Sequence, residues 1–322
     1  MNVLGIETSC DETGASVVKD GCYVLSNIVA TSLKDHQKYG GIIPEIASRR
    51  QLELIQLVVA DALDKAKVKF SDIDVIAVTR KPGLIGSLLV GISFARALSF
   101  ALNKPLVEVD HIKAHIYANF LRMTKDAKDP LPKLPAVGLV VSGGHSSLYH
   151  VRDYDQFELI GRTRDDAVGE AFDKVARILD LGYPGGPAID RLAKDGVNTE
   201  IRFPRAMMPG TYDFSFSGVK TAVFYYVNKQ GGHKDFNKAK IAYAFQESVV
   251  DVIVEKCLLA CRQRRVSILL VGGGVAANSA LRQRMAFEAS RQGIDVRFPA
   301  MSFCLDNAAM IAGLGFRLRR DK

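Results

Sequence analysis

Along the chain, short apolar runs bounded by turn residues alternate with longer runs in which apolar residues recur at helical spacing. Short runs of this kind predict β-strands, and the longer periodic runs predict helices. The turn signal Asp20-Gly21, for example, separates two strand-like runs. The first half of the chain is thereby predicted to form strands over residues 2–6, 15–18, 22–31, 74–79 and 106–109 and helices over residues 45–69 and 88–102.

The second half of the chain follows the same order of elements. Three strands come first, helices follow, and two further strands and a terminal helix come last. The predicted strands cover residues 136–141, 147–150, 158–162, 267–271 and 295–298, and the predicted helices cover residues 168–179, 188–194, 219–228, 236–262 and 305–319. An order that occurs twice without obvious residue identity predicts a duplicated α/β fold, with two lobes and a cleft between them.

The length of 322 residues suits two domains of about 150 residues each. Residues 1–108 are predicted to form an N-terminal lobe, and residues 109–322 a C-terminal lobe that carries the candidate metal and nucleotide loops. The terminal helix, residues 305–322, is expected to pack back on the N-terminal lobe. Residues 123–134 are rich in Lys, Asp and Pro, which predicts a loop.

The helix predicted over residues 45–69 has apolar residues on two faces, where a surface helix usually has one apolar stripe. Such a helix is buried on both sides, either within this chain, between its sheet and the helix over 88–102, or against a partner protein. One face carries Leu52, Ile55, Val59 and Leu63, and the other carries Leu54, Leu57 and Val58.

The composition is that of an ordinary soluble globular protein, with 48% hydrophobic and 24% charged residues. No run of about 18 uncharged apolar residues is present, so no transmembrane helix is expected. The first residues include no basic segment and reach Glu7 at once, so no signal peptide is predicted. Five cysteines without a CxxC motif suit a reducing cytoplasm. The net charge of +8 is compatible with a polyanionic partner but does not by itself indicate one.

Two histidines, His111 and His115, stand four residues apart where a predicted strand leads into a helix. Side chains at this spacing share one face of a helix and can bind one transition-metal ion. Asp306 follows Phe298-Pro299 at a similar junction, so two imidazoles and a carboxylate would form a catalytic metal site with open positions. The alternative is a pair of unrelated polar residues at the mouth of a cleft. An HExxH protease is excluded, because Ile112 occupies the position of its glutamate.

Two glycine-rich runs follow predicted strands, Val141-Ser142-Gly143-Gly144-His145 and residues 272–278. Glycine lets backbone N–H groups approach a phosphate, and a helix N-terminus favours an anion. Neither run matches the P-loop or the Rossmann fingerprint. Together, in a duplicated α/β fold, they indicate an actin-like nucleotide cleft. The hydroxyl- and acid-rich loop over residues 7–14 either binds phosphate and a hydrated metal or is an ordinary polar hairpin.

Sequence blocks along almost the whole chain resemble the bacterial TsaD family, and they occur in the family's order. Several of them are longer than the motifs described above, and together they are highly specific. The blocks are residues 5–13, 40–49, 82–91, 111–115, 141–145, 169–174, 183–187, 214–221 and 306–310.

The resemblance implies an actin-like fold and a metal-dependent acyltransferase. Members move the threonylcarbamoyl group from threonylcarbamoyl-AMP to N6 of the adenosine 3′ of the anticodon, in tRNAs that read ANN codons, and release AMP. The resemblance also implies one divalent metal per subunit, Fe2+ or Zn2+, and a TsaB-like paralogue and a TsaE-like ATPase as partners. Two alternatives remain open, a non-catalytic actin-like scaffold of the same complex and an actin-like sugar kinase or ATPase.

The resemblance assigns roles to individual residues. It implies that Glu12 lies in an acidic catalytic motif near the phosphate. Asp173 and Asp190 are expected to bind ribose hydroxyls. The implied metal ligands are His111, His115 and Asp306, and the implied substrate-binding residues are Val140, Val141, Ser142, Gly143, Gly144, Asp173, Gly186, Asp190 and Asn278. This chain departs from the family pattern at Lys81 and at Arg50-Gln51, and neither position is expected to touch the metal or the nucleotide.

Overall fold

A computed structural model describes residues 1–32, 36, 41–123, 130–197, 199–229 and 237–319. The chain divides into two compact units, Met1–Pro132 with Pro299–Lys322, and Lys133–Phe298. This division differs from the predicted boundary after residue 108. The reason is that helix α4 (His111–Tyr117) packs against the terminal helix α10 (Ala308–Leu318), which itself packs on the first sheet, as expected. Half of the predicted loop over 123–134, residues 124–129, lies outside the described residues.

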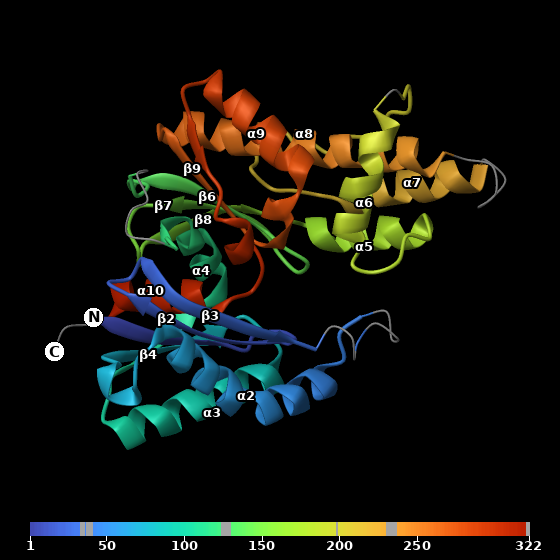
Figure 1. The fold of residues 1–322 in the computed structure, drawn as a ribbon. Coiled ribbons are helices and arrows are strands. Elements are labelled where there is room, and N and C mark those ends of the chain that lie inside the picture. Colours follow the sequence, from blue (N-terminus) through green and yellow to red (C-terminus); the bar gives the residue numbers. More distant parts are fainter. Residues whose placement is uncertain (33–35, 37–40, 124–129, 198, 230–236, 320–322) are drawn as a thin grey trace. The chain divides into compact units, whose positions relative to one another are not determined.

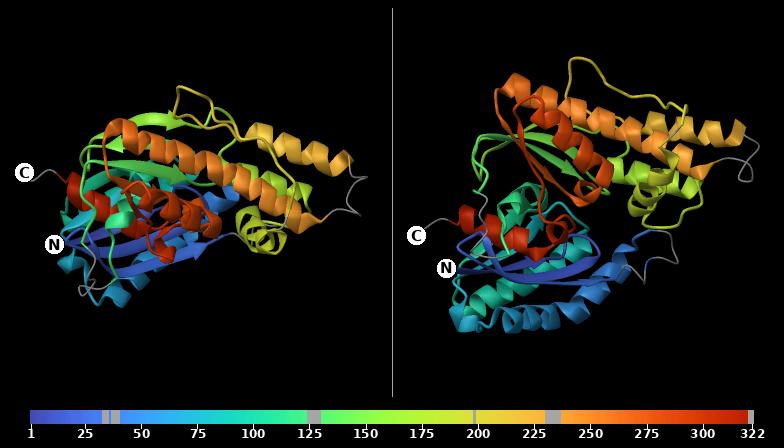
Figure 2. Two further views of the ribbon diagram at one scale, coloured as in Figure 1. Left: turned by 90° about the horizontal axis from the view of Figure 1, so that it is seen from above. Right: turned by 45° about the horizontal axis from the view of Figure 1, so that its top comes forward.

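Unit 1 is built on a five-stranded mixed sheet in the order β3-β2-β1-β4-β5. Strands β1 to β3 form antiparallel pairs, and β4 and β5 continue the sheet in parallel with β1. Helices α2 and α3 cover one face of the sheet, and α10 covers the other (Figures 1 and 2). The elements are β1 (Asn2–Glu7), β2 (Glu12–Lys19), β3 (Tyr23–Thr31), β4 (Val75–Lys81), β5 (Leu106–Asp110), α2 (Pro44–Ala66) and α3 (Ile85–Leu102).

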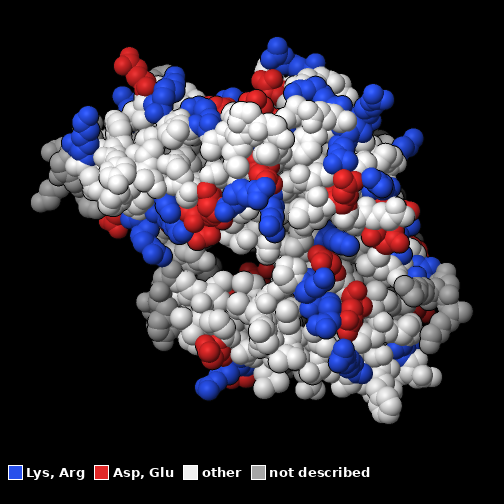
Figure 3. All heavy atoms as spheres, turned by 180° about the vertical axis from the view of Figure 1, so that it is seen from behind, with Lys and Arg blue, Asp and Glu red and all other residues white. Residues whose placement is uncertain are grey.

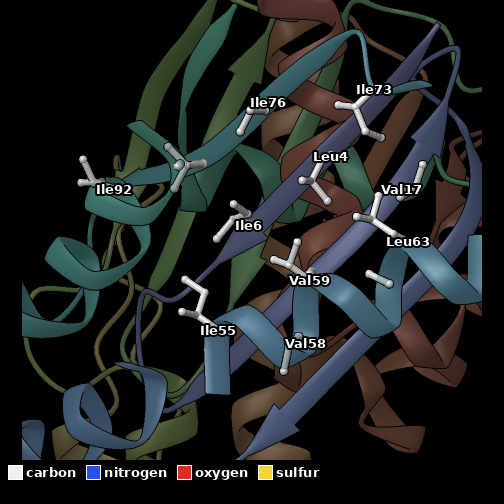
Figure 4. Close-up of a cluster of buried hydrophobic side chains, with 14 residues drawn as sticks. Leu4, Ile6, Val17, Ile55, Val58, Val59, Leu63, Ile73, Ile76 and Ile92 are labelled. Atoms are coloured by element: carbon white, nitrogen blue, oxygen red, sulfur yellow. The ribbon is translucent and has the colours of Figure 1, made fainter. Parts of the chain in front are cut away.

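The core of unit 1 lies between the sheet and α2. Leu4 and Ile6 of β1 point from the sheet toward Ile55 and Val59 of α2 (Figure 4). On the other face, a Cβ atom at Gly5 would lie only 2.3 Å from the carbonyl oxygen of Ala308. Glycine at this position therefore lets α10 pack directly on β1, close to the end of the strand that carries Glu7.

The structure corrects the predicted second stripe of α2. Val58 is buried, with 4% of its side chain exposed, because it contributes to the same core as Ile55. Leu54 packs against that core from its edge. The exposed apolar residues of α2 are Leu52 and Leu57, with exposed fractions of 70% and 61%.

Unit 2 repeats the architecture of the first sheet. Its five strands lie in the order β10-β9-β6-β7-β8, so the first strand of each unit is central and the fourth and fifth continue in parallel beside it. The predicted duplication is confirmed. The elements are β6 (Ala136–Val141), β7 (Ser146–Val151), β8 (Phe157–Arg162), β9 (Ile268–Gly272), β10 (Asp295–Arg297), α5 (Val168–Ile178), α6 (Gly185–Ala193), α7 (Ser217–Lys229), α8 (Lys238–Arg264) and α9 (Ser279–Ser290).

Short 3-10 helices complete the described structure. One of them, Gly274–Ala277, lies within the second glycine-rich run, and another, Met301–Phe303, lies shortly before Asp306. The 3-10 helices are Phe70–Asp72, Ala118–Phe120, Lys194–Gly196, Gly274–Ala277 and Met301–Phe303. Helix α9 begins at Ser279, directly after the glycine run, and α10 begins at Ala308, later than the predicted start at residue 305.

Helix α3 is the one helix in the described part of the chain that is long and apolar enough to cross a membrane, with 18 residues and a mean hydropathy of 1.8. It contains Arg96, which interrupts the apolar run and donates to Glu108 at 3.0 Å. The helix packs against α2 and β4. A packing helix of a soluble domain has the same length and composition, so α3 alone does not indicate a membrane protein.

Candidate active site

Helix α4 positions two of the predicted metal ligands. The helix begins after β5 because the side chain of Asp110 accepts hydrogen bonds from the backbone N–H groups of Ile112 and Lys113, at 3.0 and 3.1 Å. His111 and His115 are therefore the first and fifth residues of the helix and lie one above the other. Both side chains are buried, with residue exposures of 7% and 1%.

Asp306 reaches the same point from the other end of the chain. Asn307 caps α10 by accepting the N–H of Met310 at 3.0 Å, which holds Asp306 directly before the helix. Its Oδ1 atom lies 3.2 Å from Nε2 of His115 and 3.5 Å from Nε2 of His111. The two Nε2 atoms are 3.1 Å apart. The structure thus brings together the three predicted ligands, although His115 and Asp306 are 191 positions apart in the sequence.

The donor atoms of this cluster suit a cation. Two imidazole nitrogens and one carboxylate oxygen lie within 4.8 Å of one another. Three lone pairs directed at one point repel each other unless a proton or a metal ion lies between them. Nitrogen and oxygen donors of these types are preferred by divalent transition metals such as iron and zinc. The cluster could therefore hold a metal ion.

Glu7, at the end of β1, is part of this site although the sequence analysis did not select it. Its carboxylate accepts hydrogen bonds from the backbone N–H of Ser9 and the hydroxyl of Thr79, both at 2.6 Å, and lies 3.0 Å from Nδ1 of His111. Only 1% of the residue is exposed. The sequence does contain a feature that could have pointed to Glu7, an acidic residue at the end of an apolar strand. A carboxylate is rarely buried unless it is paired, so an acid at such a position is expected to have a partner.

Charge interactions set the protonation of this cluster. Burial alone would raise the pKa of Glu7, but the neighbouring His111 lowers it. Burial alone would lower the pKa of His111, but the charges of Glu7 and Asp306 raise it to about 9. Burial lowers the pKa of His115, which keeps that imidazole neutral and available as a ligand. These shifts favour a buried ion pair of Glu7 with a doubly protonated His111, and a metal ion bound at Nε2 of His111 would replace the proton there.

Glu12, the predicted catalytic acid, begins β2 after the loop that follows Glu7. Burial, followed by the charges of Asp306 and Asp11, raises its pKa to about 9. Asp306, one of the three donors, is thus the largest cause of this pKa shift after burial. A cation bound by Asp306 would oppose this effect and favour the ionised form of Glu12.

Gln51 supports the loop that carries Glu12. Its side-chain amide donates to the carbonyl oxygens of Cys10 and Glu12, at 3.0 and 2.9 Å, from the buried face of α2. Ser87 of α3 also donates to Cys10 O, at 3.0 Å. Gln51 belongs to one of the two departures from the family pattern, and its contacts are with the backbone of the Glu12 loop. That this position does not touch the metal or the nucleotide stays a prediction.

Replacing Gln51 by leucine is expected to lower the free energy of unfolding by about 1–3 kcal/mol, because two buried carbonyl groups lose their donor. Gln56 lies on the exposed side of the same helix and offers a matched control. Gln56→Leu should change stability by less than about 0.5 kcal/mol. Denaturant titrations of both variants measure the difference. Equal stabilities would contradict a supporting role for Gln51.

In unit 2, the two glycine-rich runs lie side by side. Strands β6 and β9 are parallel neighbours, with Val140 opposite Gly272, so both runs leave the same edge of the sheet. Gly273 has φ of +91°, and a Cβ atom there would lie 2.4 Å from the carbonyl oxygen of Val141. Close backbone contact between the two runs therefore requires glycine at this position.

Contacts from these runs continue through α5, α6 and α9. Gly169 of α5 donates to Ser142 O at 3.2 Å. Further along α5, Asp173 accepts the N–H of Gly185 at 2.7 Å, at the start of α6. Later in α6, Asp190 accepts the N–H and hydroxyl of Ser279, at 3.1 and 2.8 Å, at the start of α9. The predicted substrate residues of unit 2 thus belong to one continuous ring of contacts.

Three polar members of this ring already bind protein groups. Asp173 and Asp190 hold the N-terminal ends of α6 and α9. Asn278 caps α9 by accepting the N–H of Leu281 at 2.9 Å, and its amide donates to the buried Gln246 at 2.8 Å. Gln246 was not selected from the sequence, because it lies in the long helix α8. Contacts of these side chains with a ribose stay a prediction.

Open space adjoins the ring at three glycines. A Cβ atom built at Gly143, Gly144 or Gly186 would meet no atom of the described residues within 4 Å. Val140 and Val141, in contrast, are fully buried in β6 and anchor the first run. Backbone N–H groups with free space beside them can bind an anionic ligand.

Two α/β units with one strand order, a His-His-Asp cluster in one unit and a ring of glycine-rich loops in the other, define a protein with the actin-like fold. The structure is similar to that of component A of (R)-2-hydroxyglutaryl-CoA dehydratase from Acidaminococcus fermentans, with a TM-score of 0.56 and 17% identity over 98% of both chains. At this identity the likeness concerns the fold alone.

The sequence comparisons identify the family. Residues 23–313 match the family model TsaD, tRNA N6-adenosine threonylcarbamoyltransferase. The chain is 50% identical over 318 residues to the tRNA N6-adenosine threonylcarbamoyltransferase of Clostridium botulinum strain Hall, covering 98% of this chain and 92% of the relative. It is 51% identical over 316 residues to that of Clostridium perfringens strain ATCC 13124, covering 98% and 91%. The chain belongs to the TsaD family.

Proposed function

We propose that this chain transfers the threonylcarbamoyl group from threonylcarbamoyl-AMP to N6 of the adenosine 3′ of the anticodon in tRNAs that read ANN codons. The observation that carries the proposal is the identity of 50% with a transferase of this name over 98% of the chain. The buried cluster of His111, His115 and Asp306 supports it, because a non-catalytic scaffold has no use for converging metal donors.

In the reaction, N6 of adenosine attacks the carbamoyl carbon of the mixed anhydride. A C–N bond forms, the bond from that carbon to the phosphate oxygen breaks, and AMP leaves with the electron pair while N6 loses a proton. An exocyclic adenine amine is a poor nucleophile, so positioning of the two substrates supplies much of the rate. Backbone N–H groups at Gly143 and Gly144 are proposed to stabilise the phosphate as its charge grows.

The remaining unit 2 residues are proposed to hold the adenylate. Asp173 and Asp190 would accept hydrogen bonds from the ribose hydroxyls through carboxylate lone pairs that their protein contacts leave unused. Gly186 leaves room for the ligand at the start of α6. Asn278 keeps the start of α9 in place and completes this side of the site.

In unit 1, His111, His115 and Asp306 are proposed to hold one divalent metal per subunit, Fe2+ or Zn2+. When bound, the metal supplies Lewis acidity that polarises an oxygen of the substrate. Glu12 is proposed as the catalytic acid or base. Its half-buried carboxyl has a pKa of about 9, and a nearby positive charge would lower this pKa toward 7, where the group can both accept and donate a proton. Gln51 fixes the backbone beside Glu12.

Mass spectrometry of tRNA nucleosides tests the proposed function. Depletion of the protein in its host should remove N6-threonylcarbamoyladenosine, and expression of the chain should restore it. Purified chain with its partners, threonylcarbamoyl-AMP and tRNA should release AMP and modify the tRNA in equal amounts. AMP release without modified tRNA would indicate a hydrolase instead.

The exposed side of α2 and α3 is proposed to bind a TsaB-like paralogue, and this pair would then recruit a TsaE-like ATPase in the cytoplasm. Large apolar side chains are exposed along both helices, and white, uncharged residues cover much of the lower part of the face in Figure 3. Exposed apolar side chains that gather on one surface usually mark an interface. The residues are Leu52, Leu57, Ile85, Leu89 and Phe100, with exposed fractions of 70, 61, 79, 58 and 91%.

Replacing Leu52 and Leu57 together by glutamate is expected to leave the chain folded and soluble but to abolish co-purification with the paralogue. Both side chains are exposed, so the charges meet water in the free chain and an apolar partner in the complex. Val58→Glu is the contrasting variant, because Val58 is 4% exposed and its change should unfold unit 1. Undiminished co-purification of the Leu52/Leu57 double variant would rule out this surface.

A further inference from the structure

Beyond the three donors, the metal-ligand cluster includes a buried carboxylate that has no place in the reaction described above. Glu7 lies at the end of β1 with 1% of its surface exposed. Its ion-pair partner in the described part of the chain is His111, at 3.0 Å between Oε2 and Nδ1. A buried carboxylate is costly unless its oxygens receive hydrogen bonds and its charge is paired. The burial of Glu7 therefore needs an explanation in the structure or the function of this site.

The hydrogen bonds of Glu7 fix the direction of its two oxygens. Oε1 accepts the backbone N–H of Ser9, and Oε2 accepts the hydroxyl of Thr79, both at 2.6 Å. The backbone N–H can only donate, so the atom that faces Ser9 must be an acceptor. Oε2 is therefore held in place facing His111.

This arrangement decides which nitrogen of His111 carries a proton. Nδ1 lies 3.0 Å from the Glu7 carboxylate, which only accepts, and 3.2 Å from the Ser9 hydroxyl, which can accept as well as donate, so Nδ1 carries the hydrogen. Nε2 lies on the opposite side of the ring, 3.1 Å from Nε2 of His115 and 3.5 Å from Oδ1 of Asp306. An imidazole can bind a metal only through a nitrogen without a proton, and its other N–H usually donates to a carboxylate or carbonyl that fixes the ring.

His115 provides an internal comparison. Its Nε2 also faces the cluster, but its buried Nδ1 has no hydrogen-bond partner among the residues that the structure describes. No hydrogen bond on that side of the ring fixes its angle. Within the described residues, a carboxylate contact at Nδ1 is thus found at His111 and not at His115.

We propose that Glu7 is a positioning residue for the metal: it fixes His111 in the Nδ1-protonated form, with Nε2 directed at the ion. The inference rests on the proposed metal site. Together with Asp306, Glu7 also supplies a second negative charge near the ion, which favours a divalent over a monovalent cation.

The variant Glu7→Gln separates this role from simple packing. The backbone N–H of Ser9 needs an acceptor, so the new amide oxygen takes the position of Oε1 and the NH2 group takes the position of Oε2. The NH2 group then donates to Nδ1 of His111 and moves the ring proton to Nε2, toward the metal. A nearly isosteric change should therefore weaken the zinc affinity of the purified chain by about 10–100-fold, measured by competition with a chelator.

Two further variants complete the test. Thr79→Val removes one hydrogen bond of Glu7 but keeps the carboxylate, so it should reduce zinc affinity less than Glu7→Gln does. Glu7→Asp withdraws the carboxylate from His111 without adding a donor and should weaken binding even if Glu7→Gln does not fold. In zinc-loaded protein labelled with 15N-histidine, wild type should show a protected Nδ1 proton on His111, and this signal should be absent in folded Glu7→Gln.

The outcomes distinguish the inference from the metal site on which it rests. If wild-type chain binds no zinc, or His111→Ala binds it as tightly, the metal site itself is wrong. If wild type binds zinc through His111 but folded Glu7 variants bind within twofold of wild type, only the positioning role is overturned. Absence of a protected Nδ1 proton in zinc-loaded wild type would overturn it as well.

Discussion

The variant Asp306→Ala is expected to lose its bound metal and to lower the transfer rate by more than about 100-fold. Residues that contact only the ligands of a metal typically change metal affinity or activity by about 10–100-fold when they are replaced. Asp306 is one of the three direct donors, so its replacement should have a larger effect. The fold should persist, because the capping of α10 depends on Asn307 and the buried residues of that helix remain. Elemental analysis of the purified variant and a tRNA modification assay measure both effects.

Leu305→Ala is the matched control for Asp306→Ala. Leu305 is the preceding residue and is 64% exposed, so its replacement should leave metal content and activity unchanged. Wild-type metal content in Asp306→Ala would remove Asp306 from the site. Normal metal content with lost transfer would instead assign it a role in the reaction without metal binding.

The second large effect is expected at Gly273. Its φ of +91° and ψ of 164° belong to a region that is open almost only to glycine, and a Cβ atom would lie 2.4 Å from the Val141 carbonyl oxygen. Gly273→Ala should therefore destabilise the protein by about 3 kcal/mol or more, from backbone strain and the displaced strand end together. Thermal unfolding measures this loss of stability. A separate binding assay should show that the variant binds the adenylate more weakly.

Gly144→Ala is expected to leave stability unchanged and to weaken adenylate binding. A Cβ atom at Gly144 meets no described atom within 4 Å, so stability should change by less than about 0.5 kcal/mol. Adenylate affinity should still fall, because the methyl group occupies the space proposed for the phosphate. Gly273→Ala with wild-type stability, or Gly144→Ala with wild-type affinity, would contradict the respective assignment.

The sequence was sufficient to predict the elements of the fold and the three donor residues. Apolar periodicity predicts nearly every strand and helix, because each element must present apolar side chains to a core. The spacing of His111 and His115 predicts a shared direction, since α4 is helical through both residues. Asp306 could be added because it stands at a strand-to-helix junction like that of the histidines.

Other features depend on contacts between distant segments and could not be predicted in this way. Periodicity placed Val58 on a second face of α2, but the helix is rotated so that Val58 joins Ile55 in the core and Leu52 becomes exposed. Glu7 and Gln51 contribute through hydrogen bonds to residues far along the chain, and local sequence does not record such partners. The unit boundary was misplaced for the same reason, because the contact of α4 with α10 determines it.

Unit 1 is built from two stretches of the chain that lie on either side of unit 2, and this affects the order in which the two units can fold during synthesis. Its sheet and both ligand histidines come before unit 2 in the sequence, but Asp306 and the helix that covers one face of the sheet come after it. A nascent chain can fold unit 2, which is continuous, while unit 1 still exposes an apolar sheet face. Binding of a metal by all three donors therefore requires segments from both sides of unit 2, and a chain that ends after unit 2 would have His111 and His115 but no complete site.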